Sequence, residues 1–176
     1  MVGASQLIQN QFGLDRDGFR ALLLAPVSER DILIGKNLAL APIAIILGLF
    51  ALIAMQLSSP LHWSHFVATL LQLFTMYIVA CLVGNLMSIV VPLGVAAGSL
   101  KPTNLKVGAI ALQLIIFLLA PLGMIPGLMP LGVELLLQGN PRWNWLPVYL
   151  LGAFFYLVVL ALVYRQLIGV QAKLMA

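Results

Sequence analysis

Four long runs of uncharged, mostly apolar residues constrain this sequence more than any other feature. They cover residues 37–57, 66–91, 107–131 and 146–164. A helix needs about 20 apolar residues to cross the hydrocarbon of a bilayer, because lipid offers no hydrogen bonds to the backbone. Since 62% of the 176 residues are hydrophobic and 8% are charged, a water-soluble fold is excluded. The runs predict an all-α, polytopic membrane bundle of four transmembrane helices.

The first of these helices is expected to begin before its apolar run. Pro26 interrupts the preceding segment, and Ser28 is suited to cap a helix whose first turn holds Glu29 and Asp31. The helix would then project about two turns beyond the hydrocarbon. Pro42, inside the run, predicts a kink.

The third run divides into a regular part and an outer part. Val107–Leu119 is predicted to be a regular helix, whereas the outer part, which extends to residue 145, is predicted to be broken or re-entrant. This expectation rests on the helix-breaking residues Pro121, Gly123, Pro126, Gly127 and Pro130. The fourth helix is predicted to end just before Arg165.

Basic residues gather on one side of the predicted spans. Eight of the nine Lys and Arg residues lie before the first helix, between the second and third, or after the fourth, and Arg142 alone lies on the other side. Because basic loops stay in the cytoplasm, both termini are predicted to be cytoplasmic. Because the basic residues flank the membrane spans, their placement accounts for the net charge of +4. The predicted partner is therefore the lipid bilayer, and no nucleic acid is expected.

Polar side chains within the second run are all uncharged. They could line a path through the membrane, but interhelical hydrogen bonding is the favoured interpretation. The residues concerned are Gln72, Thr75, Tyr77, Asn85 and Ser88.

Candidate chemical groups are few. His62 and His65 flank Trp63, and an interfacial anchor is favoured over a metal site because no third ligand is apparent. Glu134 is the only carboxylate in the predicted outer segments, and without a partner it argues against acid–base chemistry. Cys81 stands alone, which excludes an internal disulfide. We therefore predict no catalytic residue, no metal and no cofactor.

Residues 1–28 form a predicted cytoplasmic segment that precedes a transmembrane domain of residues 29–176. The segment contains a charged turn and then a short amphipathic element over residues 19–25. It could lie on the lipid headgroups. Alternatively, Phe19, Leu22 and Leu23, at helical spacing, would fit a groove on another protein.

The stretch from residue 10 to residue 39 resembles the permease subunits of type-2 ATP-binding-cassette (ABC) exporters, in particular bacterial ones. In that family the loop between the second and third membrane helices has an acidic and basic turn with glycine, an amphipathic coupling helix, a proline step, and then Ile-Leu-x-Gly-Lys. The matching residues here are Asp15, Asp17, Gly18, Arg20, Leu22, Leu23, Pro26, Val27, Ser28, Asp31, Ile32, Leu33, Gly35 and Lys36.

The resemblance implies a membrane-spanning permease component of an export system in the bacterial inner membrane. A separate cytoplasmic ABC ATPase would supply the energy, and a second permease copy would complete the pathway. The four predicted helices would correspond to the third to sixth of the family, and residues 121–145 to its re-entrant outer hairpin. The residues implied to couple to the ATPase are Asp15, Asp17, Gly18, Phe19, Arg20, Leu22, Leu23, Pro26 and Ser28.

The family usually has six helices, whereas four are predicted here. The chain therefore resembles the carboxy-terminal portion. One expectation is a truncated or split permease, with the missing amino-terminal helices on another chain, and another is a reduced variant of the family. A non-transporting membrane scaffold or assembly factor that recruits a cytosolic protein is the alternative. An intramembrane enzyme acting on lipid is disfavoured because no paired acidic or histidine residues are apparent in the sequence.

Overall fold

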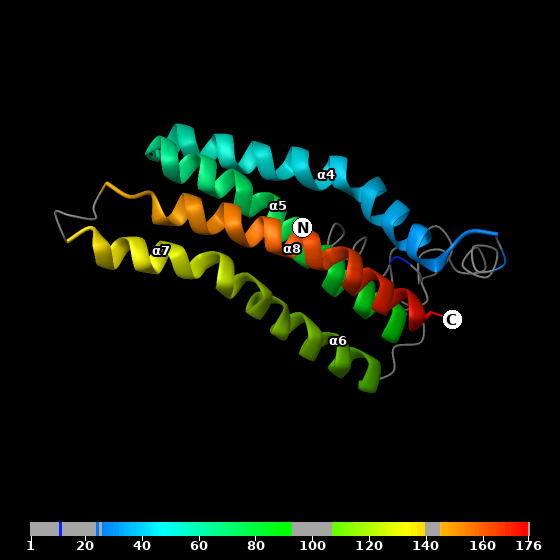
Figure 1. The fold of residues 1–176 in the computed structure, drawn as a ribbon. Helices are drawn as coiled ribbons and strands as arrows, with labels where there is room; N and C mark the ends of the chain where they lie inside the picture. The colour runs from blue at the N-terminus through cyan, green and yellow to red at the C-terminus, as the bar shows by residue number, and fades with distance from the viewer. Residues whose placement is uncertain (1–10, 12–23, 25, 93–106, 140–144, 176) are drawn as a thin grey trace. The chain divides into compact units, whose positions relative to one another are not determined.

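A computed structural model of the chain describes residues 11, 24, 26–92, 107–139 and 145–175 (Figure 1). These residues are almost entirely helical, and no strand occurs among them. The elements are α4 (Glu29–Ser58), α5 (Trp63–Val90), α6 (Val107–Leu119), the 3₁₀ helix η1 (Ala120–Met124), α7 (Ile125–Leu137) and α8 (Val148–Lys173). The predicted all-α fold is confirmed.

Four helical stretches in the described part are long and apolar enough to cross a membrane. They are Glu29–Ser58, Trp63–Val90, Ile110–Leu137 and Val148–Lys173. Large apolar side chains cover their outer surfaces, and Phe50 and Leu136, for example, are 74% and 84% exposed. So much exposed apolar surface would be unfavourable in water, but hydrocarbon solvates it. The chain is therefore a multi-pass membrane protein.

Two helix ends lie where the sequence analysis predicts them, and two helices extend further than predicted. α4 begins at Glu29 and α6 ends at Leu119, both as predicted. However, α7 continues to Leu137, and α8 passes Arg165 and reaches Lys173, so the end predicted for the fourth helix is wrong. Ile168, in the added turns of α8, is fully buried, and this packing stabilises helix beyond the apolar run.

The predicted break after α6 is present as the 3₁₀ helix η1. Pro121 has no N–H to donate to the carbonyl of Phe117, so the α-helical ladder cannot continue through it. Pro126 lies in the first turn of α7, where a missing N–H costs nothing. The residues after the break therefore form a second helix of 13 residues rather than an irregular segment.

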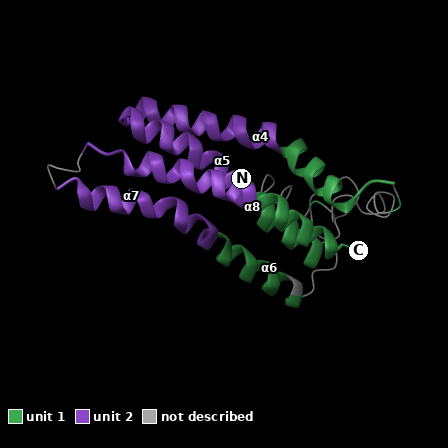
Figure 2. Ribbon diagram, in the orientation of Figure 1, with its two compact units in different colours: residues 1–40, 80–120, 164–176 green, residues 41–79, 121–163 purple. Residues whose placement is uncertain are grey.

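The chain divides into two compact units, each of which contains parts of several helices (Figure 2). Unit 1 comprises residues 1–40, 80–120 and 164–176. In its described core, Ile32 and Leu33 of α4 pack with Ile168 and Ala172 of α8. Unit 1 therefore joins the first turns of α4 to the last turns of α8.

Unit 2 comprises residues 41–79 and 121–163. Its buried core contains Ala68, Tyr149 and Ala153. Gly152 of α8 lies directly against the ring of Pro130, and a Cβ atom at position 152 would overlap that ring. Small residues at such contacts let membrane helices approach closely, and dispersion contacts then hold them together.

We expect Gly152→Ala to destabilise the protein by about 1–3 kcal/mol, because the proline ring cannot rotate away from the added methyl group. Equilibrium unfolding in mixed detergent and dodecyl sulfate micelles measures the change. Gly169→Ala is the matched control on the same helix, since nothing lies within 4 Å of its added Cβ. Equal losses in the two variants would contradict the packing assigned to Gly152.

Candidate functional site

The structure describes two of the nine residues predicted to couple the chain to an ATPase. Pro26 and Ser28 are exposed and come directly before α4. The other seven lie outside the described residues, and their predicted role stays a prediction. They are Asp15, Asp17, Gly18, Phe19, Arg20, Leu22 and Leu23.

Ser28 caps α4, as the sequence predicts. The Asp31 N–H donates to the Ser28 hydroxyl oxygen at 3.2 Å, and the Ser28 hydroxyl donates to Asp31 Oδ2 at 2.6 Å. The Ile32 N–H donates to the Ser28 carbonyl oxygen at 3.1 Å. Glu29 and Asp31 also place negative charge at the positive end of the helix dipole. The position at which α4 begins is therefore fixed by its own local sequence.

Buried amides tie the start of α4 to the end of α8 within unit 1. Asn37 is 3% exposed, and its Nδ2 donates to the Tyr164 hydroxyl at 2.9 Å. Gln11 Nε2 donates to the other side of the same amide, Asn37 Oδ1, at 3.4 Å. These bonds and the apolar contacts of Leu33 with Ile168 act together. Displacement of the first turns of α4 would therefore displace the last turns of α8.

A second amide pair connects α5 with α8. Asn85 Nδ2 donates to Gln171 Oε1 at 3.4 Å, and Gln171 Nε2 donates to the Leu82 carbonyl oxygen at 2.7 Å. Asn85 therefore has the interhelical role that was favoured for the polar residues of the second run. Thr75 instead donates to the Leu71 carbonyl oxygen of its own helix.

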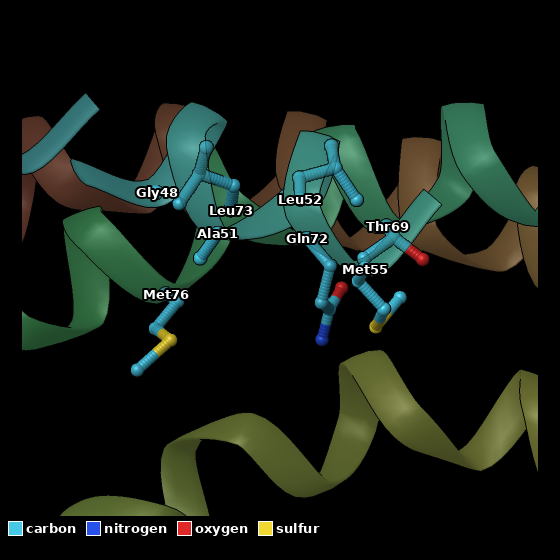
Figure 3. A pocket seen from close by; sticks show the side chains of 8 residues that line it. All are labelled: Gly48, Ala51, Leu52, Met55, Thr69, Gln72, Leu73 and Met76. Carbon is cyan, nitrogen blue, oxygen red and sulfur yellow. The ribbon is translucent and has the colours of Figure 1, made fainter. Parts of the chain in front are cut away.

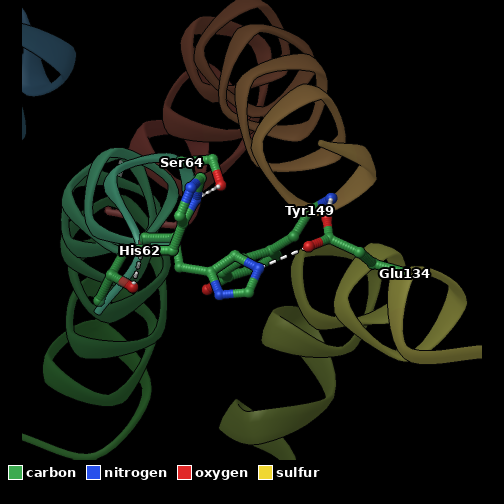
Figure 4. A network of polar contacts seen from close by, with 6 residues as sticks. His62, Ser64, Glu134 and Tyr149 are labelled. Carbon is green, nitrogen blue, oxygen red and sulfur yellow. Dashed lines mark hydrogen bonds and ion pairs between the residues drawn. The ribbon is translucent and has the colours of Figure 1, made fainter. Parts of the chain in front are cut away.

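Glu134 occupies a polar centre where three helices of unit 2 meet (Figure 4). Glu134 is 8% exposed and lies in the last turns of α7. Glu134 Oε1 lies 2.5 Å from His65 Nε2 of α5, and Glu134 Oε2 accepts from the Tyr149 N–H of α8 at 2.6 Å. The expectation that Glu134 has no partner is therefore wrong.

The Tyr149 bond supplies a helix cap from a different helix. The first N–H groups of any helix lack an acceptor within it. Leu146 and Pro147, which directly precede α8, have no polar side chain that could accept. Glu134 fills this role, and its negative charge at the amino-terminal end of α8 is stabilised by the helix dipole.

The residues around the two histidines have separate functions. Trp63 is 73% exposed and stacks on Phe66 with ring centroids 5.7 Å apart, which suits the predicted interfacial anchor. His62 bonds to Ser64 Oγ through Nδ1 at 2.9 Å. His65 instead faces inward, with its ring against Tyr149 at a centroid distance of 5.9 Å.

This arrangement binds three helices together more readily than it binds a ligand. Both carboxylate oxygens of Glu134 are already engaged, and the described residues contain no group of three potential metal ligands. Sequence reasoning missed the pairing because His65 lies 69 residues away from Glu134. The available signal was a single carboxylate flanked by apolar residues on both sides, within the span Ile110–Leu137.

We expect Ser28→Ala to weaken the start of α4 by about 1 kcal/mol through loss of the cap. Hydrogen exchange followed by mass spectrometry would show about fivefold faster exchange of the amides at residues 31 and 32. Ser58→Ala is the matched control at the other end of α4, where the hydroxyl donates to the Ala54 carbonyl oxygen. Unchanged exchange in Ser28→Ala would show that the cap does not limit opening.

We expect Glu134→Ala to destabilise the protein by about 1–3 kcal/mol, because it leaves the partly buried His65 and the buried Tyr149 N–H without their acceptor. Glu134→Gln should cost less, since one amide oxygen still accepts. Unfolding in mixed micelles compares the two. Leu136→Ala, at a position 84% exposed on the same helix, serves as the control. A loss in Leu136→Ala as large as in Glu134→Ala would contradict the assigned role.

No protein-family model, no curated protein and no solved structure matches this chain.

Proposed function

We propose that this chain is a membrane-spanning permease component of an ABC-type export system, energised by a separate cytoplasmic ATPase. The observation that carries the proposal is the form of α4. It is one uninterrupted helix of 30 residues that begins at Glu29, directly after its capping residue Ser28 and the segment that resembles a coupling helix. Such a helix connects the cytoplasmic segment and the membrane interior without an intervening loop.

The length of α4 supports this interpretation. At 1.5 Å per residue, 30 residues span about 45 Å, whereas the hydrocarbon of a bilayer is about 30 Å thick. All the charged residues of α4 lie within its first eight residues. They are Glu29, Arg30, Asp31 and Lys36. These residues lie on the cytoplasmic side if both termini are cytoplasmic, as the distribution of Lys and Arg favours.

The contacts at the start of α4 would pass a movement onward. Leu33 is fully buried with Ile168, and Asn37 donates to Tyr164, so the first turns of α4 are held to α8 by both apolar and polar contacts. ATP binding would close the partner ATPase, move the coupling segment and then shift these joined turns. In this scheme the chain supplies no residue for ATP hydrolysis, and its contribution is mechanical.

The partners in this scheme are the cytoplasmic ABC ATPase and a second permease copy in the bacterial cytoplasmic membrane. In type-2 ABC exporters, which the amino-terminal stretch resembles, the coupling helix docks into a cleft of the ATPase. Residues 15–27 are therefore the proposed docking segment, and Phe19, Leu22 and Leu23 supply its apolar contacts.

Affinity purification of the tagged full chain from its native membrane in mild detergent tests this proposal. We expect an ABC ATPase to co-purify with the native chain and to be lost when residues 15–27 are replaced by a Gly/Ser linker of equal length. A chain with residues 139–145 replaced in the same way is the control, because this loop follows α7 on the predicted opposite side. That control should retain the ATPase.

Three outcomes distinguish the candidate functions. Loss of the ATPase only with the 15–27 replacement supports the permease proposal. Recovery of a different cytosolic protein that depends on the same residues, without an ATPase, supports the scaffold alternative. Recovery of no cytosolic protein with a folded native chain would overturn both.

A further inference from the structure

A cavity of about 330 Å³ lies between α4 and α5 within unit 2 (Figure 3). Its lining is apolar except for two residues of α5, and none of the lining residues is charged. The lining residues are Gly48, Ala51, Leu52, Met55, Thr69, Gln72, Leu73 and Met76. A volume near 300 Å³ is at the lower end of the range for small-molecule sites.

Gln72 is the unusual member of this lining. The residue is 8% exposed, and neither its Nε2 nor its Oε1 has a hydrogen-bond partner among the described residues. Burying an unpaired amide in an apolar environment is strongly unfavourable, and hydrocarbon cannot compensate for it. A stable protein therefore needs a partner for this amide, and the cavity is the place from which that partner can approach.

The position of the Gln72 amide is restricted by its surroundings. A Cβ atom at Gly127 of α7 would lie 2.5 Å from Gln72 Nε2 and 2.9 Å from Tyr156 Cδ1, so the amide packs directly against a glycine. Figure 3 shows the side chains of Gln72, Met55 and Met76 projecting to the same side of the α4–α5 pair. The lack of a side chain at Gly127 therefore gives the amide its space.

Thr69 adds one more polar atom to the cavity. It lies three residues before Gln72, so the two side chains share a face of α5. The Thr69 hydroxyl donates to the His65 carbonyl oxygen at 2.8 Å, which uses its proton and leaves an oxygen lone pair that can accept. Gln72 offers both a donor and an acceptor. The complementary partner is a group that both donates and accepts.

We propose that this cavity binds a neutral, single-chain amphiphile whose hydroxyl or carboxamide group pairs with Gln72. The apolar lining fits the body of such a molecule, and the absence of charge disfavours a carboxylate or an amine. Met55 and Met76 have flexible, polarisable side chains that adapt to varied apolar shapes. A single bridging water would pair with Gln72 and Thr69 but would leave most of the apolar cavity empty, whereas an amphiphile fills it as well. The proposal does not depend on the ATPase.

Photolabelling of the full chain in phosphatidylcholine nanodiscs tests this site. The probe is dodecanamide that carries a diazirine and an alkyne, and the matched probe is the same chain ending in a methyl group. We expect saturable labelling by the amide probe on peptides that contain residues 48–55 and 69–76. Gln72→Met should reduce this labelling about tenfold, as expected when a hydrogen bond to a buried group is lost, and should leave labelling by the methyl probe unchanged.

Two further variants complete the test. Gln113→Met makes the same chemical change on α6, where Gln113 donates to the Val91 carbonyl oxygen, and should leave both probes unaffected. Ala51→Leu keeps Gln72 but fills the cavity from an exposed position, and should reduce labelling by both probes. If Gln72→Met fails to fold, unchanged labelling of Ala51→Leu by the amide probe would by itself overturn the proposal. Uniform labelling along the helices, or equal effects of Gln72→Met on both probes, would overturn the proposal.

Competition with unlabelled molecules shows whether the ligand is a free amphiphile or a bilayer lipid. Displacement of the amide probe by unlabelled dodecanamide alone would identify a free single-chain molecule as the ligand. Displacement also by diacylglycerol, a neutral membrane lipid with a free hydroxyl group, would identify a bilayer lipid that inserts one chain. Displacement by neither would mean that the probe only partitions into the bilayer, which would overturn the proposal.

Discussion

Hydrocarbon provides no hydrogen-bond partner, and the structure follows from this constraint at two levels. At the level of the backbone, each span is helical, since a helix satisfies its own N–H and C=O groups. At the level of side chains, buried polar groups find partners on other helices of the same unit. Asn37 bonds to Tyr164, Asn85 to Gln171, and Glu134 to His65. Thr75 bonds within its own helix, whereas neither polar atom of the Gln72 amide has a partner among the described residues, and a cavity lies beside it.

The two units meet this constraint with different chemistry. In unit 1, neutral amides and large aliphatic side chains join α4, α5 and α8. In unit 2, a carboxylate, an imidazole and closely packed glycines join α5, α7 and α8. A charge buried in this way is stable only when its partners remain in place, because an unpaired carboxylate in an apolar environment is very unfavourable. Unit 2 therefore depends on the simultaneous presence of three helices.

Features set by local sequence could be predicted, and features set by distant contacts could not. Ser28 with Asp31 determines where α4 begins, and Pro121 determines where α6 gives way to η1, because capping and proline effects act within one helical turn. The extension of α8 to Lys173 depends on contacts with α4, which lies more than 100 residues earlier. The pairing of Glu134 likewise required the fold. The coupling role of residues 15–23 lies outside the described residues and stays a prediction.

The cap on α8 has a consequence for the way the chain is made. A helix that carried its own Ser or Asp cap could begin at the correct residue as soon as it was synthesised. α8 lacks such a residue and relies on Glu134, which belongs to the helix before it. Because translation runs from the amino terminus, the ribosome releases α7 ahead of α8, and the acceptor for Tyr149 already exists when that residue emerges. The acceptor is therefore made before the helix that needs it, so the start of α8 can be capped without any residue synthesised later.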